Sequence, residues 1–363
     1  MLKLICAFLF VLALLTDSAH AQSFQADYTA SIGADAWTSQ SVPVRYQPDY
    51  STANPWRAVN PWAKASGTLT LGDIRINAAA RYNPVDGSRV DRLDADFQLT
   101  DSTGVRVGPV LPYRVSTCPT YDAASPWISS PNVFCRFTGL AEMSTGGAGA
   151  QAYGSTAAGD WLIDIMGGAY KPSLDGQDKK LAIYVPVGPN TRHDKIGASL
   201  NATNTDTGTQ IRASWLRSWQ DQASDAGGYL RILRYDTVFA GVEKRLSATV
   251  EAKASAAAYI GGQVNPAYPY TFRAVSTTAE LSWTPRYAHT LSIGANHYQN
   301  TTTYTTSVQR LRVPSVQAAY RYDMTSGRYL IIQALKTQDT YIRQTGTTDR
   351  SGTSIGIRIA QNF

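Results

Sequence analysis

Hydrophobic and polar residues alternate along most of the chain with a period of two, the pattern of strands that have one apolar and one polar face. The last ten residues are an example, because Ile355, Ile359 and the terminal Phe363 share one face while Arg358 lies on the other. The segment 249–260 repeats the alternation with valine, alanines and isoleucine against threonine, glutamate, lysine and serine. The pattern therefore predicts an all-β protein.

The alternating segments are numerous enough to predict a closed sheet. Their number is even, as it is in the transmembrane barrels that bacteria make from a single chain. We expect sixteen strands, near residues 24–37, 62–71, 73–82, 89–100, 104–114, 146–156, 160–171, 194–205, 209–221, 228–245, 248–261, 273–285, 290–301, 307–323, 328–341 and 349–363.

The connections between these segments alternate in length. Short turns such as 101–104 and 325–327 follow the even-numbered segments, whereas long connections at 38–61, 115–145 and 172–193 follow odd-numbered ones. Short periplasmic turns and longer outer loops are typical of outer-membrane barrels. A soluble sandwich needs fewer strands, and a propeller needs a repeat of fixed period, which this chain lacks. The sequence therefore predicts a transmembrane antiparallel β-barrel.

Two segments depart from the simple pattern. The apolar phase is odd at Leu311 and Val313 but even from Val316 onward, which predicts a β-bulge at Pro314–Ser315. The apolar run 179–187 falls within a loop on this count. If it pairs as an added strand, the barrel has eighteen strands, so eighteen is the alternative to sixteen.

The N-terminus predicts export. Lys3 precedes the apolar run LICAFLFVLALL, and Ala19 and Ala21 satisfy the small-x-small rule for cleavage. We expect a Sec signal peptide at 1–21 that is cleaved, a barrel at 22–363, and the bacterial outer membrane as destination. No later segment has the ~18–20 consecutive apolar residues of a membrane-spanning helix. The chain carries a formal net charge of +6 without a compact Lys/Arg run, so we expect no nucleic-acid partner.

Two cysteines, Cys118 and Cys135, remain after the signal peptide. An even pair in an oxidising compartment predicts a disulfide. The histidines are not spaced around the cysteines as metal ligands are, so we expect neither a metal site nor a cofactor. His297 has the lipid-facing phase, and His193 and His289 lie in different connections, so no nucleophile has a base within reach. We therefore expect no enzymatic activity.

A barrel of sixteen strands encloses an aqueous channel unless something fills it. The first predicted strand begins almost at the cleavage site, which leaves no length for a separate plug domain. Any restriction must therefore come from a loop. The longest connection, 115–145, is the candidate for a constriction loop.

The hairpins that flank this loop resemble those of a known family. RVDRLDADFQLTDSTGVRVGPVLPYR at 89–114 and GAGAQAYGSTAAGDWLIDIMGGAY at 147–170, with the strand rhythm and the terminal Phe363, are similar to the sixteen-stranded trimeric outer-membrane porins, both general and phosphate-selective. The resemblance implies a homotrimer whose third outer loop folds into the pore. The chain departs from many relatives at 112–114, where they carry a Pro-Phe-Gly-like segment, and in its cysteine pair.

The strand phase predicts which charged side chains line the channel. In the similar porins an arginine ladder faces carboxylates of the third loop, and Asp122 and Glu142 are the corresponding loop acids here. Further basic residues at inward phase outnumber Glu251 and Glu280, which predicts a weak preference for anions. The alternative is that the arginines pair with Asp94 and Asp96 and only solvate the interior. The predicted ladder comprises Arg75, Arg81, Arg92, Arg106 and Arg358, and the further basic residues are Lys195, Arg212, Lys253, Arg310 and Arg321.

These expectations combine into one function. We expect a passive channel for small hydrophilic solutes and ions, embedded in outer-membrane lipid. An adhesive role for the outer loops and a solute-specific channel, for example for phosphate or organic acids, are the alternatives, and an enzymatic barrel fits the sequence less well.

Overall fold

The computed structural model describes residues 24–40, 60–83, 87–110, 125–128, 147–172, 192–222, 231–263, 269–324 and 327–363. None of these residues forms a helix long and apolar enough to cross a membrane. The predicted signal peptide at 1–21 and the run 179–187 lie outside the described residues.

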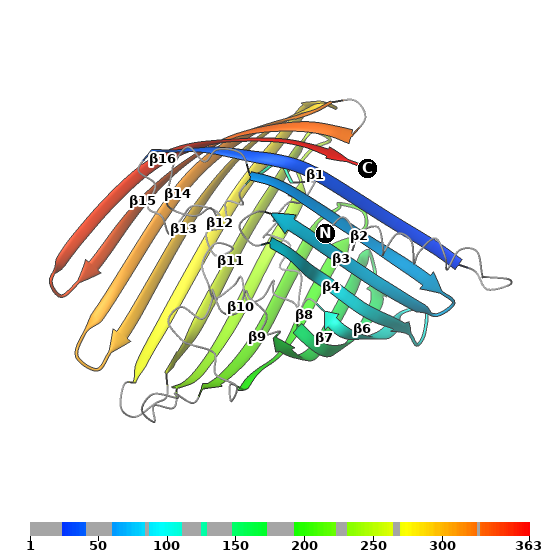
Figure 1. Cartoon of the computed structure of the whole chain (residues 1–363), viewed down its shortest axis with the longest axis horizontal. Coiled ribbons are helices and arrows are strands. Elements are labelled where there is room, and N and C mark those ends of the chain that lie inside the picture. The colour runs from blue at the N-terminus through cyan, green and yellow to red at the C-terminus, as the bar shows by residue number, and fades with distance from the viewer. Residues whose placement is uncertain are drawn as a thin grey trace.

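The described residues form a barrel of long antiparallel strands, of up to 17 residues each (Figure 1). The strands are β1 (Phe24–Gln40), β2 (Asn60–Leu71), β3 (Ile74–Asn83), β4 (Gly87–Gln98), β5 (Thr103–Val110), β6 (Gly147–Ala158), β7 (Trp161–Pro172), β8 (Arg192–Asn204), β9 (Gln210–Gln222), β10 (Arg231–Arg245), β11 (Val250–Gln263), β12 (Tyr270–Arg286), β13 (His289–Tyr304), β14 (Val308–Asp323), β15 (Arg328–Arg343) and β16 (Gly346–Asn362).

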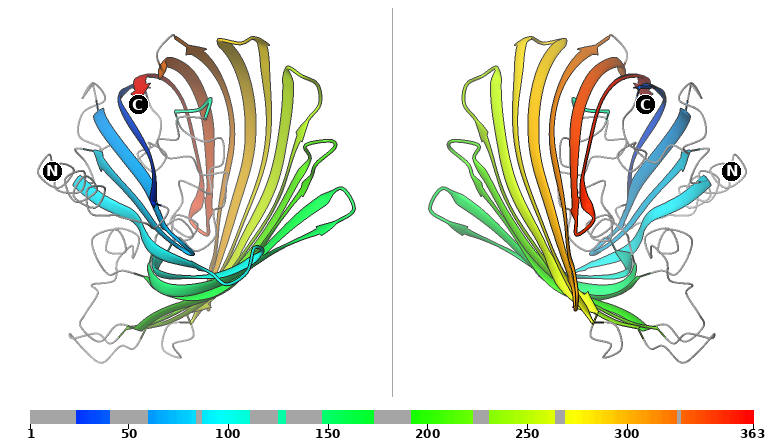
Figure 2. Two further views of the ribbon diagram at one scale, coloured as in Figure 1. Left: turned by 90° about the vertical axis from the view of Figure 1, so that its right-hand side faces the viewer. Right: turned by 90° about the vertical axis from the view of Figure 1, so that its left-hand side faces the viewer.

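The sheet closes on itself, with each strand bonded to its neighbours in sequence and β16 bonded to β1. Phe363 continues the closing ladder, since its backbone N–H donates to the Ala30 carbonyl at 2.8 Å. Figure 2 shows the strands curving around an enclosed space. The sixteen predicted strands are confirmed with shifts of a few residues at their ends. The eighteen-strand alternative is wrong for the described chain, because the closed circuit of sixteen leaves no free edge for another strand.

The alternation of the sequence separates two faces of the wall. In β16, Ser354 and Arg358 are buried, whereas Ile355, Ile357 and Ile359 are 47%, 43% and 60% exposed. The polar face turns toward the enclosed space and is called the inner face below; the apolar face is the outer face. Because most of the outer face is exposed and apolar, the barrel matches a lipid environment.

The connections differ between the two ends of the barrel, which are called the turn end and the loop end. At the turn end, strands are joined by two to five described residues in most places, as at 72–73, 159–160 and 287–288. The long connections 41–59 and 111–146 lie at the loop end, as predicted, although 344–345 between β15 and β16 is short.

The predicted bulge at Pro314–Ser315 is wrong. The pairing of β14 with β13 runs without a shift through His297↔Pro314, and the pairing with β15 stops after Arg312 and resumes in the same register at Ser315. Pro314 has no N–H to donate, so it interrupts one ladder without moving the strand. Val313 consequently keeps the inner phase and is fully buried, whereas Arg310 is exposed on the outer face, contrary to prediction. Register shifts occur instead at Ala79/Ala80 and at Trp283/Arg286.

Candidate pore interior

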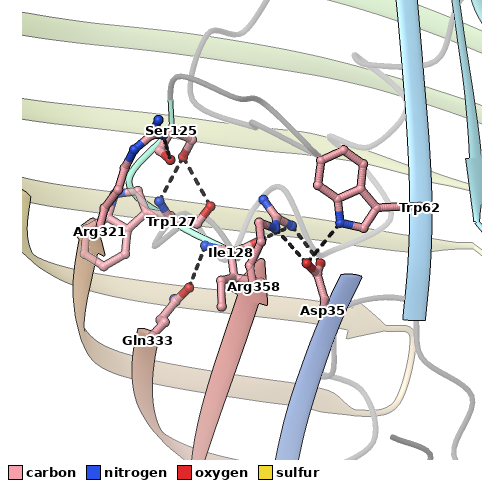
Figure 3. A network of polar contacts seen from close by, with 8 residues as sticks. All are labelled: Asp35, Trp62, Ser125, Trp127, Ile128, Arg321, Gln333 and Arg358. Carbon is pink, nitrogen blue, oxygen red and sulfur yellow. Dashed lines mark hydrogen bonds and ion pairs between the residues drawn. The ribbon is translucent and has the colours of Figure 1, made fainter. Parts of the chain in front are cut away.

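A short part of the predicted constriction loop, Ser125–Ile128, lies against the inner face of the barrel (Figure 3). The chain leaves β5 at Val110, but Ser125 lies at another part of the barrel wall. There the Ser125 carbonyl accepts a hydrogen bond from Arg321 of β14. Six strands separate β5 from β14 in one direction and eight in the other. The loop thus reaches the wall opposite its origin.

Four side chains of the wall hold this segment by hydrogen bonds, three of them at 2.9 Å. Arg321 donates to the Ser125 carbonyl at 2.9 Å, and Gln333 of β15 accepts from the Ile128 N–H at 2.9 Å. The Trp127 indole N–H donates to Glu280 of β12 at 2.9 Å. The backbone groups of a loop that leaves water need such partners. The contacts therefore fix the position and orientation of the segment.

The wall beneath the segment is apolar. Side chains of β2, β14, β15 and β16 form a buried cluster with the two hydrophobic residues of the loop, on the inner face of the barrel. Burial of apolar area stabilises this packing in addition to the hydrogen bonds. The cluster comprises Trp62, Trp127, Ile128, Ala319, Tyr329, Ile331 and Ala360.

Arg358, a predicted residue of the arginine ladder, lies on the inner face but is only 1% exposed. Its guanidinium contacts both carboxylate oxygens of Asp35 in β1 at 2.7 Å, across the seam where the barrel closes. Asp35 also accepts from the Trp62 indole N–H at 3.0 Å, and the guanidinium lies 5.2 Å from the Trp62 ring centre. Arg358 also donates to the Ile128 carbonyl at 3.4 Å. It therefore joins the seam to the loop rather than facing open solvent.

Two other predicted ladder residues stand on a different part of the wall. Arg106 of β5 forms an ion pair with Asp96 of β4 at 3.0 Å and stacks on Tyr153, whose hydroxyl donates to Asp96 at 2.7 Å. Arg75 of β3 donates to Gln98 at 2.9 Å. For Arg106 the geometry matches the alternative in which an arginine pairs with a neighbouring acid of the wall. Arg358 belongs to the same wall of strands but to a separate network.

The remaining predicted site residues are not placed. The backbones of Arg81 and Arg92 are in β3 and β4, opposite Arg89 and Ala79, but their side chains lie outside the description. The loop acids Asp122 and Glu142 and the cysteines Cys118 and Cys135 lie outside the described residues. The facing arrangement of arginines and loop acids, and the disulfide, therefore stay predictions.

A cavity of about 530 Å³ lies between the loop segment and strands β9–β14. Basic and acidic side chains line it together, and most are paired. Lys253 contacts Glu251 at 2.7 Å and Glu243 at 3.4 Å, and Arg212 lies 3.9 Å from Glu243. Arg321 pairs with Asp323, so this part of the interior is a strongly polar but largely charge-balanced surface. Such a surface suits hydrated solutes and ions.

Within the described chain, no three His, Cys, Asp or Glu side chains gather as metal ligands would. Asp35, Trp62, Trp127 and Gln333 were not among the predicted site residues. Their roles depend on contacts between strands and a loop that are distant in sequence. The signal in the sequence was the hydrophobic run of β15, whose Tyr329 and Ile331 belong to the buried cluster.

No protein-family model matches the chain, and neither does any curated protein sequence. Solved structures do match. The outer-membrane channel DcaP of Acinetobacter baumannii is 9% identical and superposes with a TM-score of 0.59 over 94% of this chain and 97% of its own. An anion-selective porin from Comamonas acidovorans is 12% identical, with a TM-score of 0.56 over 94% and 100%.

The trimer form of OmpT, an outer membrane protein of Vibrio cholerae, is 9% identical, with a TM-score of 0.58 over 94% of this chain and 100% of its own. At these identities the similarity concerns the fold. Its extent, the closed circuit of sixteen strands and the two faces of the wall agree: the chain has the fold of the sixteen-stranded outer-membrane porins.

Proposed function

We propose that this protein is an outer-membrane porin, a water-filled channel for the passive diffusion of small hydrophilic solutes and ions. The observation that carries the proposal is the Ser125–Ile128 segment, which is anchored to the inner face of a barrel with an apolar outer face. A sixteen-stranded barrel leaves room for an aqueous channel, and a segment held against its inner face restricts that channel. The polar cavity beside the segment supports passage of hydrated solutes.

Liposome swelling with sugars of graded size tests the channel. The full-length mature chain, reconstituted as a folded barrel, should admit small sugars at rates that fall with sugar size. Arg321→Gln, which removes a hydrogen bond to the loop, should raise the size limit, whereas Lys336→Gln on the outer face should leave it unchanged. Folded barrels that admit no sugar would contradict the proposal and favour an adhesive role.

We infer a weak preference for anions. The chain carries a net charge of +6, but the described basic residues of the interior, such as Arg106, Lys253 and Arg321, have carboxylate neighbours. Paired charges limit the fixed field, so the permeability ratio of chloride to potassium should exceed one by only a small factor. Reversal potentials in a potassium chloride gradient measure it, and clear cation selectivity would contradict the inference.

We also propose a homotrimer, as the trimer form of the Vibrio cholerae protein suggests. The described outward side chains of β1, β2 and β3 are uncharged, as at Leu69, Ile76 and Ala78, and such a face can pack against a second copy. Ala78→Glu should shift the mass in detergent from trimer to monomer. Ala198→Glu on the outer face of β8 is the matched control and should remain trimeric, and equal effects of both variants would contradict this interface.

The proposed location requires export and processing. The mature chain from outer-membrane fractions should begin at Gln22, after removal of residues 1–21. Its mass should rise by two hydrogens on reduction, because we expect Cys118 and Cys135 to be joined by a disulfide. Intact mass spectrometry before and after reduction tests both expectations, and a chain that retains residues 1–21 would contradict the first.

A further inference from the structure

Arginine side chains gather on part of the outer face, where most other positions are apolar. The alternation of each strand places these arginines on the outer face. Arg217 is itself exposed in β9, and the other arginines either share a strand and face with an exposed residue, as with Val238 in β10 and Val316 in β14, or pair with one, as with Ile260 of β11. We call this set the outer arginine group. It comprises Arg217 of β9, Arg234 of β10, Arg273 of β12, and Arg310 and Arg312 of β14.

The register joins the group into one band. Asp236 pairs with Arg217 on one side and Ile260 on the other, and the same row continues through Arg273, Thr301 and Arg310. Adjacent strands are about 4.8 Å apart, so Arg273 and Arg310, two strands apart, start from backbones about 10 Å apart. Each arginine stands toward the loop end of its strand. The band therefore encircles part of the barrel near the loop end.

The band is strongly basic. Asp236 belongs to the same row, but Arg217 binds both of its oxygens at 2.9 and 3.0 Å, and the Trp215 indole N–H donates to it at 3.0 Å. Both oxygens of Asp236 are thus engaged by Arg217, at the β9 end of the band. On the opposite wall, the described outward side chains of β1–β3 carry no charge. The charge is therefore a local feature of the β9–β14 side.

A groove of about 1100 Å³ lies within the band. Arg234 and Arg273 line it with His297, Gln299 and Thr301, and Ile260 and Val275 give it an apolar part. Such a surface offers donors to an anionic group and apolar contact to the chain attached to that group. This is the chemistry of a lipid whose headgroup carries phosphate.

Energetics favours the same assignment. A lipid-facing arginine costs about 2–4 kcal/mol at the bilayer midplane and about 0–1 kcal/mol near the interface. Five such residues on one side therefore lie outside the hydrocarbon, at the depth of the headgroups or beyond it. There the planar guanidinium binds phosphate oxygens through two parallel hydrogen bonds.

We propose that the outer arginine group binds the phosphate-bearing headgroups of lipids that surround the loop end of the barrel, with Arg273 and Arg310 at its centre. The site lies on the outside of the wall and is independent of the channel. The proposal rests on the proposed membrane location but not on the channel, so lipid binding and solute passage can each fail without the other.

The test compares two lipids that differ only in phosphate. Trimer or monomer barrels are reconstituted in phosphatidylcholine vesicles that contain either phosphatidic acid or diacylglycerol of the same acyl chains. Binding is read from the enrichment of each lipid that stays with the barrel after gentle extraction in detergent. Phosphatidic acid should be enriched at least tenfold over diacylglycerol. Inorganic phosphate at equal concentration should not displace it, because the apolar part of the groove holds only the lipid.

Variants locate the binding. The triple variant Arg273→Gln, Arg310→Gln, Arg312→Gln should lose most of the enrichment, whereas Lys336→Gln, an outward cation on β15 outside the band, should keep it. Unchanged strand content in circular dichroism shows that the triple variant is folded. The proposal would be overturned by equal enrichment of both lipids or by displacement of the lipid by inorganic phosphate alone. It would also be overturned if both variants lost the enrichment equally, or if the triple variant bound the lipid as well as the unchanged protein does.

Discussion

The contact between Arg358 and Asp35 should stabilise the barrel more than any other described ion pair. Both side chains are 1% exposed, and the carboxylate accepts two hydrogen bonds from the guanidinium at 2.7 Å and one from Trp62 at 3.0 Å. The pair joins the first strand to the last. Arg358→Met keeps most of the side-chain volume and removes the charge, which leaves the enclosed carboxylate without the guanidinium while the Trp62 indole still donates to it.

Removing one partner of a buried ion pair typically costs about 3–5 kcal/mol, because the other charge stays buried without compensation. The pair of Arg106 with Asp96 is the matched control. Its distance, 3.0 Å, is similar, and the Asp96 side chain is only 5% exposed, but Arg106 is 28% exposed. Removal of Arg106 therefore opens Asp96 to water, and the Tyr153 hydroxyl still donates to this carboxylate. Arg106→Met should therefore cost about 1 kcal/mol. The prediction concerns the difference in unfolding free energy between Arg358→Met and Arg106→Met.

Equilibrium unfolding by urea in lipid vesicles, followed by tryptophan fluorescence, measures both costs on folded protein. The double variant Asp35→Asn, Arg358→Met removes both charges and should be less destabilised than the sum of the single variants. A cost for Arg358→Met within about 0.5 kcal/mol of that for Arg106→Met would refute the reasoning, since additive effects for distant sites agree within that range. Strict additivity of the double variant would refute it too.

Three further changes have defined outcomes. Trp127→Ala removes the hydrogen bond to the wall and the main apolar contact of the loop, so single-channel conductance should rise and fluctuate more; an unchanged current trace would contradict this anchor. Gly33→Ala places a Cβ 2.6 Å from the Trp62 ring and should cost about 1–3 kcal/mol in urea unfolding, whereas Gly72→Ala, in open space at φ +58°, should cost about 1 kcal/mol. Ile357→Lys puts a charge on the outer face at mid-strand and should lower stability in vesicles by about 2–4 kcal/mol; full stability would place this face away from lipid.

The strands could be predicted because the barrel imposes one simple rule on most of its residues. The outer face is mostly apolar and the inner face mostly polar, so the side chains of a strand alternate in polarity, and the ends of the alternation mark the turns. In β11 and β16 this rule held at nearly every position. The inward phase of Arg75, Arg106 and Arg358 followed from it directly.

The rule failed where an apolar residue stands on the inner face. Val313 was assigned to the outer face because it is apolar, and a bulge was then needed to restore the phase at Val316. The strand is regular, and Val313 is buried among interior side chains. The error also placed Arg310 inward, although it belongs to the outer arginine group. A rule that assigns apolar residues to the outer face and polar residues to the inner face cannot predict an apolar residue that is buried on the inner face.

The same limit explains why the anchor of the loop was missed, and β15 shows what the missing signal was. Its segment 329–335 is apolar at every position but one, with Tyr329, Ile331 and Leu335 inward and Leu330 and Ile332 outward. The exception is the inward Gln333, which accepts the hydrogen bond from the Ile128 N–H. A strand that borders an open channel needs a polar inner face, whereas a strand buried on both faces reads as a continuous hydrophobic run. Such a run in a barrel wall therefore marks the place where part of the chain covers the interior, and the Trp127–Ile128 segment packs there. By this reasoning the position of an inward loop can be read from the wall strand that loses its alternation, before the loop itself is considered.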